Sequence, residues 1–326
     1  MAIKVRDLSK TFKVATKEPG LAGSIKSLVK RNYIEKTALK NVSLDIQQGE
    51  MIGLIGANGA GKTTLVKILA GIIHPSFGEV SVLGFNPWDR SDELRRQMAL
   101  IMGQKAQLWY DLPALDSYML LKEIYQIEDR LYKSQIEFLA DVLNIKDQLK
   151  VQVRKLSLGE RMKVELMGAL LHRPNVVYLD EPTIGLDLMA QKAVRGFLKN
   201  YQKEFKPIIL LTSHYMEDIK ELCQRVVLIK AGELIYDGAL ATIQKNFGEQ
   251  KRVSLSLDQM PETRPVIDSS LGSFEWQTDK VILSTTRQNL NAAMEYSMKL
   301  FTPNDITIQD PSIEEVIESY LRKGFQ

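Results

Sequence analysis

The chain has few of the features that mark secreted, membrane-spanning or nucleic-acid-coating proteins. Cys223 is the only cysteine among 326 residues, so an intrachain disulfide is excluded and a reducing compartment is expected. No apolar run approaches the ~20 residues that cross a bilayer, and the first residues lack the apolar core of a signal peptide. If the protein acts at a membrane, its membrane part is expected on another chain.

The chain also lacks a large excess of charge of either sign. The sequence has 43 Lys and Arg residues against 40 Asp and Glu residues, which leaves a formal net charge of +3. Surfaces that coat nucleic acid normally have a strong basic excess, so no nucleic-acid partner is expected. With 44% hydrophobic and 25% charged residues, the composition is that of a globular protein with a sizeable core. The length suits one large domain and one small one.

The most informative segment is residues 56–63, which match the phosphate-binding pattern G-x-x-x-x-G-K-[ST] without a gap. Its glycines let the backbone curl so that successive N–H groups point at a polyphosphate. Lys62 adds a positive charge near the β- and γ-phosphates, and the Thr63 hydroxyl can ligate Mg²⁺. Residues 51–55 have the pattern of a buried strand, and a helix from Thr64 would direct its N-terminus at the anion. A nucleotide site is therefore predicted here.

Two further apolar runs, residues 175–180 and 206–211, are typical of buried strands in a parallel sheet. A helix predicted at 185–200 between them makes a β-α-β unit. Asp180 ends the first run, where it can hold Mg²⁺, and Glu181 beside it can orient or deprotonate an attacking water. A simple turn at Asp-Glu-Pro is the alternative interpretation of this pair.

The three histidines and the cysteine differ in their expected surroundings. His214 follows a buried strand, where its side chain can reach a nucleotide at the carboxyl edge of the sheet. His74 and His172 fall at predicted helix ends, where surface or capping roles are expected. Cys223 is expected in the core and not as a reactive thiol.

Residues 156–160 read Leu-Ser-Leu-Gly-Glu and precede a helical run from Arg161. On their own they predict a capped helix start, with Ser157 near the N-cap. The order of motifs along the chain is more specific. The motifs follow in this order: a phosphate loop, a helical stretch, Leu-Ser-x-Gly-Glu, Asp-Glu-Pro, Gly-Leu-Asp and a strand ending in His. By this order of motifs, residues 1–245 resemble the ATP-binding subunits of ABC transporters.

The resemblance implies an α/β fold: a P-loop NTPase ABC cassette with a parallel-sheet core, an antiparallel β subdomain and a helical subdomain that carries the signature motif. The ATP-binding domain is expected at residues 1–245, with its helical subdomain at about 104–170. A small C-terminal α+β accessory domain is expected at 246–326. Its predicted elements are strands at 252–257 and 280–284 and helices at 288–300 and 312–322.

The resemblance also implies roles for residues of the catalytic machinery. Glu181 matches the catalytic glutamate of the family, and His214 matches the switch histidine. Gln104 matches the Q-loop glutamine, which senses Mg²⁺ and the attacking water. The implied ligands of Mg²⁺ are Thr63, Gln104 and Asp180, the last being the Walker B aspartate.

Nucleotide contacts are implied on both sides of an ATP molecule. Phe12 would stack on the adenine, Asp187 matches the D-loop, and Ser157 and Gly159 match signature residues that contact the γ-phosphate of ATP held by an opposite subunit. One departure stands out, because Glu160 replaces the glutamine of the commonest signature, Leu-Ser-Gly-Gly-Gln. The implied phosphate loop comprises Gly56, Ala57, Asn58, Gly59, Ala60, Gly61, Lys62, Thr63 and Thr64.

From the resemblance we expect an ATP-binding and hydrolysing subunit that powers export through separate transmembrane subunits of an ABC-2 type transporter. Two copies would close head to tail over ATP and Mg²⁺ as a peripheral complex at the cytoplasmic face of the membrane. Features shared with ABC-2 exporters are a long insertion at 15–36, the stretch 104–113 and a tail ending at 313–317. The substrate is not determined by this sequence.

Two alternatives to export stay open. One is an ABC importer ATPase, and the other is a non-transport ABC ATPase that acts on nucleic acid or the ribosome. The second is disfavoured, because the chain lacks heptads between Lys62 and Ser157, paired cysteines for zinc, and a second phosphate loop.

Two segments have competing interpretations. Residues 15–36 carry apolar positions at helical spacing beside basic ones, which fits either a solvated helical insertion or a contact with a membrane. This insertion is expected to separate Phe12 from the next strand. Trp109, Tyr110 and Leu112 fit either anchors for a helix of the membrane subunit or the core of the helical subdomain.

Overall fold

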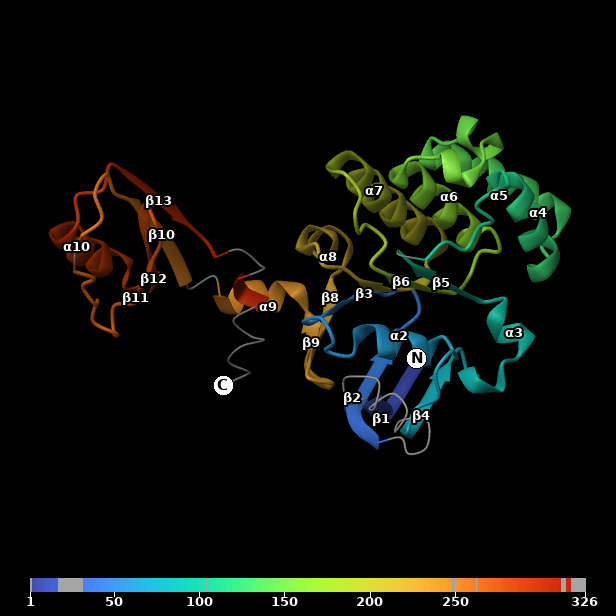
Figure 1. Cartoon of the computed structure of the whole chain (residues 1–326), viewed down its shortest axis with the longest axis horizontal. Helices are drawn as coiled ribbons and strands as arrows, with labels where there is room; N and C mark the ends of the chain where they lie inside the picture. The colour runs from blue at the N-terminus through green and yellow to red at the C-terminus, as the bar shows by residue number, and fades with distance from the viewer. Residues whose placement is uncertain are drawn as a thin grey trace, which may run out of the picture. The chain divides into compact units, whose positions relative to one another are not determined.

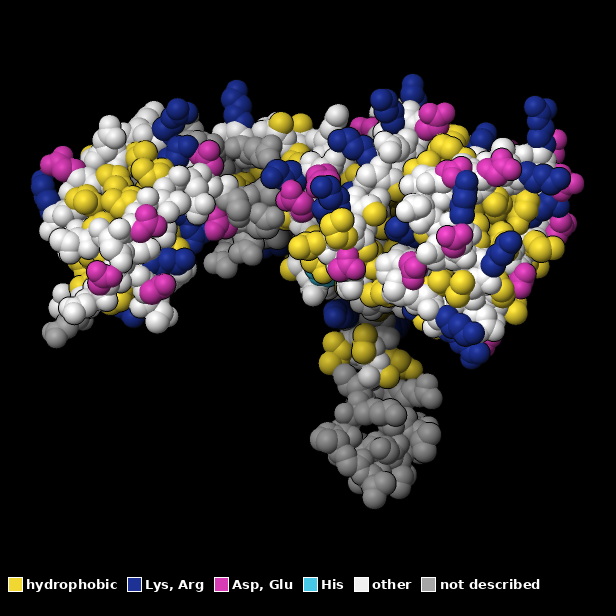
Figure 2. All heavy atoms as spheres, turned by 90° about the horizontal axis from the view of Figure 1, so that it is seen from above, with side chains coloured by type: hydrophobic (Ala, Val, Ile, Leu, Met, Phe, Trp, Pro, Cys, Tyr) yellow, Lys and Arg dark blue, Asp and Glu magenta, His cyan; other side chains and the backbone are white. Residues whose placement is uncertain are grey.

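The computed structural model describes residues 2–16, 32–103, 105–247, 250–261, 263–311 and 315–317. The chain divides into two compact units, Met1–Gly238 and Ala239–Gln326. Of the helices in these described stretches, none combines the length and the apolar character that a membrane crossing requires. Figure 2 shows Lys and Arg side chains interspersed with Asp and Glu, in keeping with the small net charge.

A six-stranded sheet forms the centre of the first unit. Its first five strands in spatial order pair in parallel. Every residue of the three strands β3, β6 and β7 is buried, which explains why their sequences are apolar almost throughout and do not alternate. The strands are, in order, β5 (Met98–Met102), β6 (Val176–Asp180), β7 (Ile208–Thr212), β3 (Met51–Ile55), β8 (Arg225–Lys230) and β9 (Glu233–Ala239).

A second sheet of the first unit is antiparallel, in the order β2 (Asn32–Ile46), β1 (Ile3–Thr16) and β4 (Phe77–Val82). β1 and β2 are longer than the strands predicted at 3–8 and 42–46, because they continue pairing beyond the part that packs on the core. Phe12 pairs directly with Lys36 of β2. The prediction that the insertion separates Phe12 from the next strand is therefore wrong. The helical pattern predicted within the insertion lies outside the described residues.

The helix after the phosphate loop, α2 (Lys62–Leu69), lies between the two sheets (Figure 1). Its buried Leu65 and Ile68 belong to one hydrophobic cluster with Ile3 of β1 and Tyr178 of β6. The antiparallel sheet, α2 and one face of the central sheet thus share a core. α2 begins at Lys62, slightly before the expected start at Thr64.

Helices α6, α7 and α8 lie on the opposite face of the central sheet, and α4 and α5 pack beside α6 (Figure 1). α7 begins at Leu188 and not at Gly185 because the Asp187 carboxylate accepts a hydrogen bond from the Ala190 N–H at 2.8 Å. The helices of this unit are α3 (Asp92–Arg95), α4 (Ala114–Tyr125), α5 (Asp129–Leu143), α6 (Leu158–Leu170), α7 (Leu188–Phe205) and α8 (Met216–Leu222). Short 3-10 turns are η1 (Pro87–Asp89), η2 (Asp147–Lys150) and η3 (Val153–Lys155).

The second unit contains a four-stranded antiparallel sheet beside α10 (Leu290–Leu300), after an entry helix α9 (Leu240–Phe247). Its strands are, in order, β11 (Ser273–Trp276), β12 (Lys280–Thr286), β10 (Gln250–Ser256) and β13 (Asp305–Gln309). β10, β12 and α10 were predicted, whereas β11 and β13 were not. Of the helix expected at 312–322, residues 315–317 are described, and they are helical.

The predicted fold class is confirmed: a parallel-sheet core, an antiparallel β subdomain, a helical subdomain and a small C-terminal α+β unit. Cys223 is buried, as expected of a core residue. Burial raises the pKa of its thiol well above the ordinary value, which makes the thiolate scarce.

Candidate functional site

Three adjacent strands, β6, β7 and β3, bring the predicted site residues to one edge of the central sheet. Because these strands are parallel, their carboxyl ends meet at the same edge. β3 leads into residues 56–61, β6 ends at Asp180, and β7 leads into Ser213 and His214. Segments that are far apart in the sequence therefore meet at the N-terminus of α2.

Glycine is required at two positions of the phosphate loop by close backbone approaches. A Cβ atom at Gly56 would lie 2.2 Å from the Ile229 carbonyl oxygen, and one at Gly61 would lie 2.5 Å from the Ala38 carbonyl oxygen. Gly61 also has φ +116°, which L side chains rarely adopt. The Gly232 N–H donates to the Ala60 carbonyl at 2.9 Å. The loop is thus held between β2 and the β8–β9 turn.

Lys62 places a buried cation at this loop. Its residue is 7% exposed, and its Nζ donates to the carbonyl oxygens of Gly56 at 2.6 Å and Ala57 at 3.2 Å. Burial lowers the pKa of the ammonium, while the charges of Glu181 and Asp180 act in the opposite direction. A buried ammonium beside a curled glycine loop is suited to bind polyphosphate.

The Asp180 carboxylate accepts hydrogen bonds from two threonines. The Thr63 hydroxyl of α2 lies 3.1 Å from Oδ2 and 3.2 Å from Oδ1, and the Thr212 hydroxyl of β7 donates to Oδ1 at 2.7 Å. Carboxylate and hydroxyl oxygens are the hard ligands that Mg²⁺ prefers. Thr63 and Asp180, expected as metal ligands, therefore lie together, and their chemistry fits the ion.

Glu181 and His214, predicted from separate motifs, are in direct contact, with 2.8 Å between Oε1 and Nε2. Glu181 has φ +58°, in the left-handed region that non-glycine residues rarely occupy. Its N–H donates to the backbone oxygen and the hydroxyl of Thr212, at 3.0 and 3.1 Å. On its other side, a Cβ at Gly103 would lie 2.0 Å from the Glu181 carbonyl oxygen. The carboxylate is held in place by constraints on both sides of its backbone.

Sequence reasoning missed a buried polar network next to this pair. Asp218 of α8 is fully buried, and its Oδ2 accepts hydrogen bonds from the hydroxyls of Thr183, at 2.5 Å, and Ser213, at 2.6 Å. Its Oδ1 pairs with Arg195 of α7 at 3.0 Å. The network connects the segment that follows Glu181 to the residue that precedes His214. The available signal was an aspartate beside buried Ile219, one helical turn after the histidine.

The signature residues occupy the N-terminus of α6. Ser157 is its N-cap, as predicted, and forms a reciprocal capping box with Glu160. A Cβ at Gly159 would lie 3.0 Å from Cβ of Ala190, so the starts of α6 and α7 are neighbours. No hydrogen bond between described residues joins Ser157 or Asp187 to the phosphate loop.

The predicted roles of Phe12 and Gln104 are not tested by contacts in the structure. Phe12 is half-buried on β1, with the Lys10 ammonium 5.0 Å from its ring centroid. Its contact with adenine stays a prediction. Gln104 lies outside the described residues, directly after Gly103.

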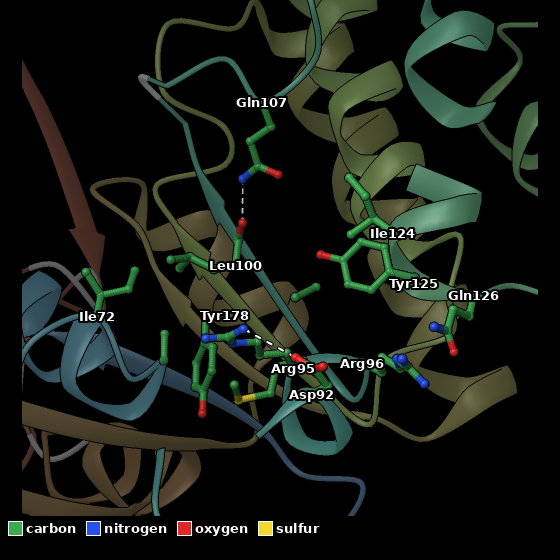
Figure 3. Close-up of a pocket in the computed structure, with 13 residues that line it drawn as sticks. Ile72, Asp92, Arg95, Arg96, Leu100, Gln107, Ile124, Tyr125, Gln126 and Tyr178 are labelled. Carbon is green, nitrogen blue, oxygen red and sulfur yellow. Dashed lines mark hydrogen bonds and ion pairs between the residues drawn. The ribbon is translucent and has the colours of Figure 1, made fainter. Parts of the chain in front are cut away.

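A hollow of about 480 Å³ lies between β5, α3 and the end of α4 (Figure 3). Ile124 and Tyr125 point into it from α4, and Gln107 reaches its rim from the segment after β5. That segment is anchored by the buried Glu165 carboxylate, which accepts the Gln107 N–H at 3.0 Å. Arg95 of α3 and the neighbouring Arg96 also line the hollow, and Arg95 pairs there with Asp92 at 3.3 Å.

Shortly after Gln107 in the sequence, Trp109, Tyr110 and Leu112 are 50%, 43% and 40% exposed. The interpretation of these three side chains as core of the helical subdomain is therefore wrong. His172 also differs from expectation, because its ring stacks on Tyr125 at 3.9 Å between centroids and its Nε2 lies 3.0 Å from the Met98 oxygen. A surface or capping role for His172 is wrong, because the ring fills the space between α4 and β5.

Comparison with known proteins gives consistent results. A family model described as "ABC transporter" matches residues 39–184. The chain is similar to the ABC transporter ATP-binding protein NatA of Bacillus subtilis (strain 168), with 34% identity over 64% of this chain and 85% of the relative. It is 32% identical to the Nod factor export ATP-binding protein I of Burkholderia thailandensis, over 66% of this chain and 70% of the relative. A solved ATP-binding subunit of an ABC transporter superposes with a TM-score of 0.62 and 26% identity, covering 76% of this chain and 94% of that one.

The Asp218 network yields a stability prediction. Replacing Asp218 with Ala leaves Arg195 buried without its main partner, so the variant should lose about 3–5 kcal/mol of unfolding free energy. Urea denaturation would measure this, with Glu217→Ala on the exposed side of the same helix as the control, expected to lose less than about 1 kcal/mol. Equal losses in the two variants would contradict the proposed importance of the network.

His172 yields a pH prediction. Burial lowers its pKa from 6.5 to about 4, and Nδ1 is buried without a hydrogen-bond partner among the described residues. The folded state thus disfavours the proton that the unfolded chain accepts, so this stability is present above pH 6.5 and is lost as the pH falls towards 4. The stability advantage of the wild type over His172→Gln should shrink by about 3 kcal/mol across that range. A constant advantage in denaturation experiments would contradict the assignment.

Proposed function

The chain belongs to the ABC transporter family of ATP-binding proteins, and from this membership we propose that it powers export through transmembrane subunits carried on separate chains, as in ABC-2 type transporters. The protein is an ATPase subunit of a transporter. The name of the Burkholderia relative refers to export, which supports the outward direction. The insertion and the stretch 104–113 support the ABC-2 type.

The observation that carries the ATP-hydrolysing part of the proposal is the Glu181–His214 contact of 2.8 Å beside Lys62 and Asp180. Lys62 and the loop N–H groups would bind the phosphates, and Thr63 and Asp180 would hold Mg²⁺. When bound, Mg²⁺ supplies positive charge that stabilises the transferring phosphoryl group. The Glu181 carboxylate, oriented by His214, would accept a proton from the attacking water.

Gln104 and Phe12 keep their proposed roles at this site. Gln104 would contact Mg²⁺ and the water from its position after Gly103, whose close approach to Glu181 brings the two segments together. Phe12 would stack on the adenine from the partly exposed face of β1.

We also propose that the ATP site is completed by a second copy of the chain. Ser157, Gly159 and Asp187 would contact ATP held by the phosphate loop of the other copy. Next to Asp187, the large apolar side chains of Leu188 and Met189 are 79% and 78% exposed. Adjacent apolar residues with this exposure are suited to burial in a protein interface, and head-to-tail closure would cover them.

The contact with the membrane subunit is proposed at the hollow lined by Tyr125 and Arg95. An inward-facing apolar pair, Ile124 and Tyr125, and the exposed ring of Trp109 would receive a short helix of that subunit. This contact would hold the protein at the cytoplasmic face of the membrane as a peripheral subunit. ATP-driven closure would then move the attached helices.

Replacing Glu181 with Gln tests the function directly. The variant keeps the shape of the side chain but loses the base, so ATP binding should persist while turnover falls by at least about 100-fold. ATP should also hold two copies together in this variant. Phosphate release at steady state and equilibrium binding of ATP would measure the two effects.

Lys62→Ala serves as the complementary variant. It should lose ATP affinity, since the buried ammonium is absent, whereas Glu181→Gln should not. Wild-type rates of phosphate release in Glu181→Gln would contradict the assignment of the catalytic base.

A further inference from the structure

We propose that Glu160 restrains the signature serine and thereby weakens the ATP-driven pairing of two copies. The inference rests on the proposed function, in which Ser157 contacts the γ-phosphate of ATP bound to the other copy. It concerns one of the two positions, Leu158 and Glu160, at which the signature departs from the commonest sequence of the family. It assigns Glu160 the role of a positioning residue that acts through Ser157.

The two side chains are joined by three hydrogen bonds. The Ser157 hydroxyl donates to Oε2 of Glu160 at 2.8 Å, and the Ser157 N–H donates to the same oxygen at 3.0 Å. In return, the Glu160 N–H donates to the Ser157 hydroxyl oxygen at 3.3 Å. The other carboxylate oxygen, Oε1, accepts from the side-chain amide of Gln148 in η2 at 3.0 Å. Glu160 is therefore fixed in position, and the serine with it.

The hydroxyl of Ser157 has only one proton, and it already donates this proton in its hydrogen bond to Glu160. A phosphate oxygen accepts hydrogen bonds and cannot donate at neutral pH once ionised, so it needs that same proton. For Ser157 to bind a γ-phosphate, its O–H must first turn away from the Glu160 carboxylate. The bond that is lost is charge-assisted, which makes this exchange costlier than the loss of a neutral hydrogen bond.

The charge of Glu160 acts in the same direction. The hydrogen bonds from Ser157 and Gln148 lower the pKa of its carboxyl group, so it is ionised at neutral pH. A phosphate bound to the hydroxyl of Ser157 would lie close to this negative charge and be repelled by it. The N-terminus of α6 and Lys163 offset part of the repulsion.

Glutamine at position 160 would weaken the first effect and remove the second. Its amide oxygen can still accept the Ser157 N–H, so the cap is retained. The Ser157 hydroxyl would donate to this same oxygen, and its bond to a neutral amide is weaker than the charge-assisted bond to a carboxylate, so a phosphate displaces it more easily. The negative charge is lost as well. A role limited to capping α6 predicts the opposite trend, because a weaker capping box would lower the stability of the signature helix.

The test uses the full chain with Glu181→Gln, so that ATP is not consumed. Analytical ultracentrifugation would give the ATP concentration at which half of the chains are paired. Adding Glu160→Gln should lower this concentration by about tenfold. Adding Glu137→Gln, which removes the same charge from an exposed position of α5, should change it less than about twofold. Far-UV circular dichroism would verify that each variant is folded.

The possible outcomes separate the inference from the proposed function. In one outcome the Glu181→Gln parent pairs with ATP, but adding Glu160→Gln leaves the pairing unchanged or weakens it. That outcome overturns the inference and leaves the proposed function intact. An equal gain from Glu137→Gln also overturns it, because the effect would then follow from net charge. Absence of ATP-driven pairing in the parent overturns the head-to-tail arrangement and this inference together.

Discussion

The hydrogen bonds from Thr63 and Thr212 to the Asp180 carboxylate are the interaction on which the site depends. They connect the helix after the phosphate loop with the ends of two neighbouring strands. The backbone oxygen and the hydroxyl of Thr212 also accept the N–H of Glu181, which has a left-handed conformation and contacts His214. Moving Asp180 would therefore disturb the phosphate loop, the metal ligands and the catalytic pair at once.

A second buried carboxylate, Asp218, connects the loops that follow β6 and β7, as Asp180 connects the ends of these strands with α2. It joins the segment after Glu181 to the residue before His214 through two hydroxyls, and Arg195 balances its charge. Buried hydrogen-bonded networks of this kind fix positions closely, since any displaced member would be left unsatisfied. The reacting groups are thus positioned before a ligand arrives.

Much of the fold could be predicted from the sequence, because its strands are buried on both faces and its phosphate loop has a fixed glycine pattern. The contact of Glu181 with His214 could be expected from their places at two strand ends. The partners of Asp218 could not, because Thr183 is remote in the chain, and the position of Asp218 one helical turn after His214 does not by itself indicate a network. β11 and β13 were missed because both are short, and β13 is exposed along its whole length.

The central claim is that this chain holds half of an ATP site and that a second copy supplies the other half. Mixing Lys62→Ala chains with Ser157→Ala chains tests it most directly, because each mixed pair regains one site with both halves intact. The account predicts that the two variants, each inactive alone, together recover roughly a quarter of the wild-type ATPase rate. No recovery above the sum of the separate variants, with mixed pairs verified by differential tags, would contradict it.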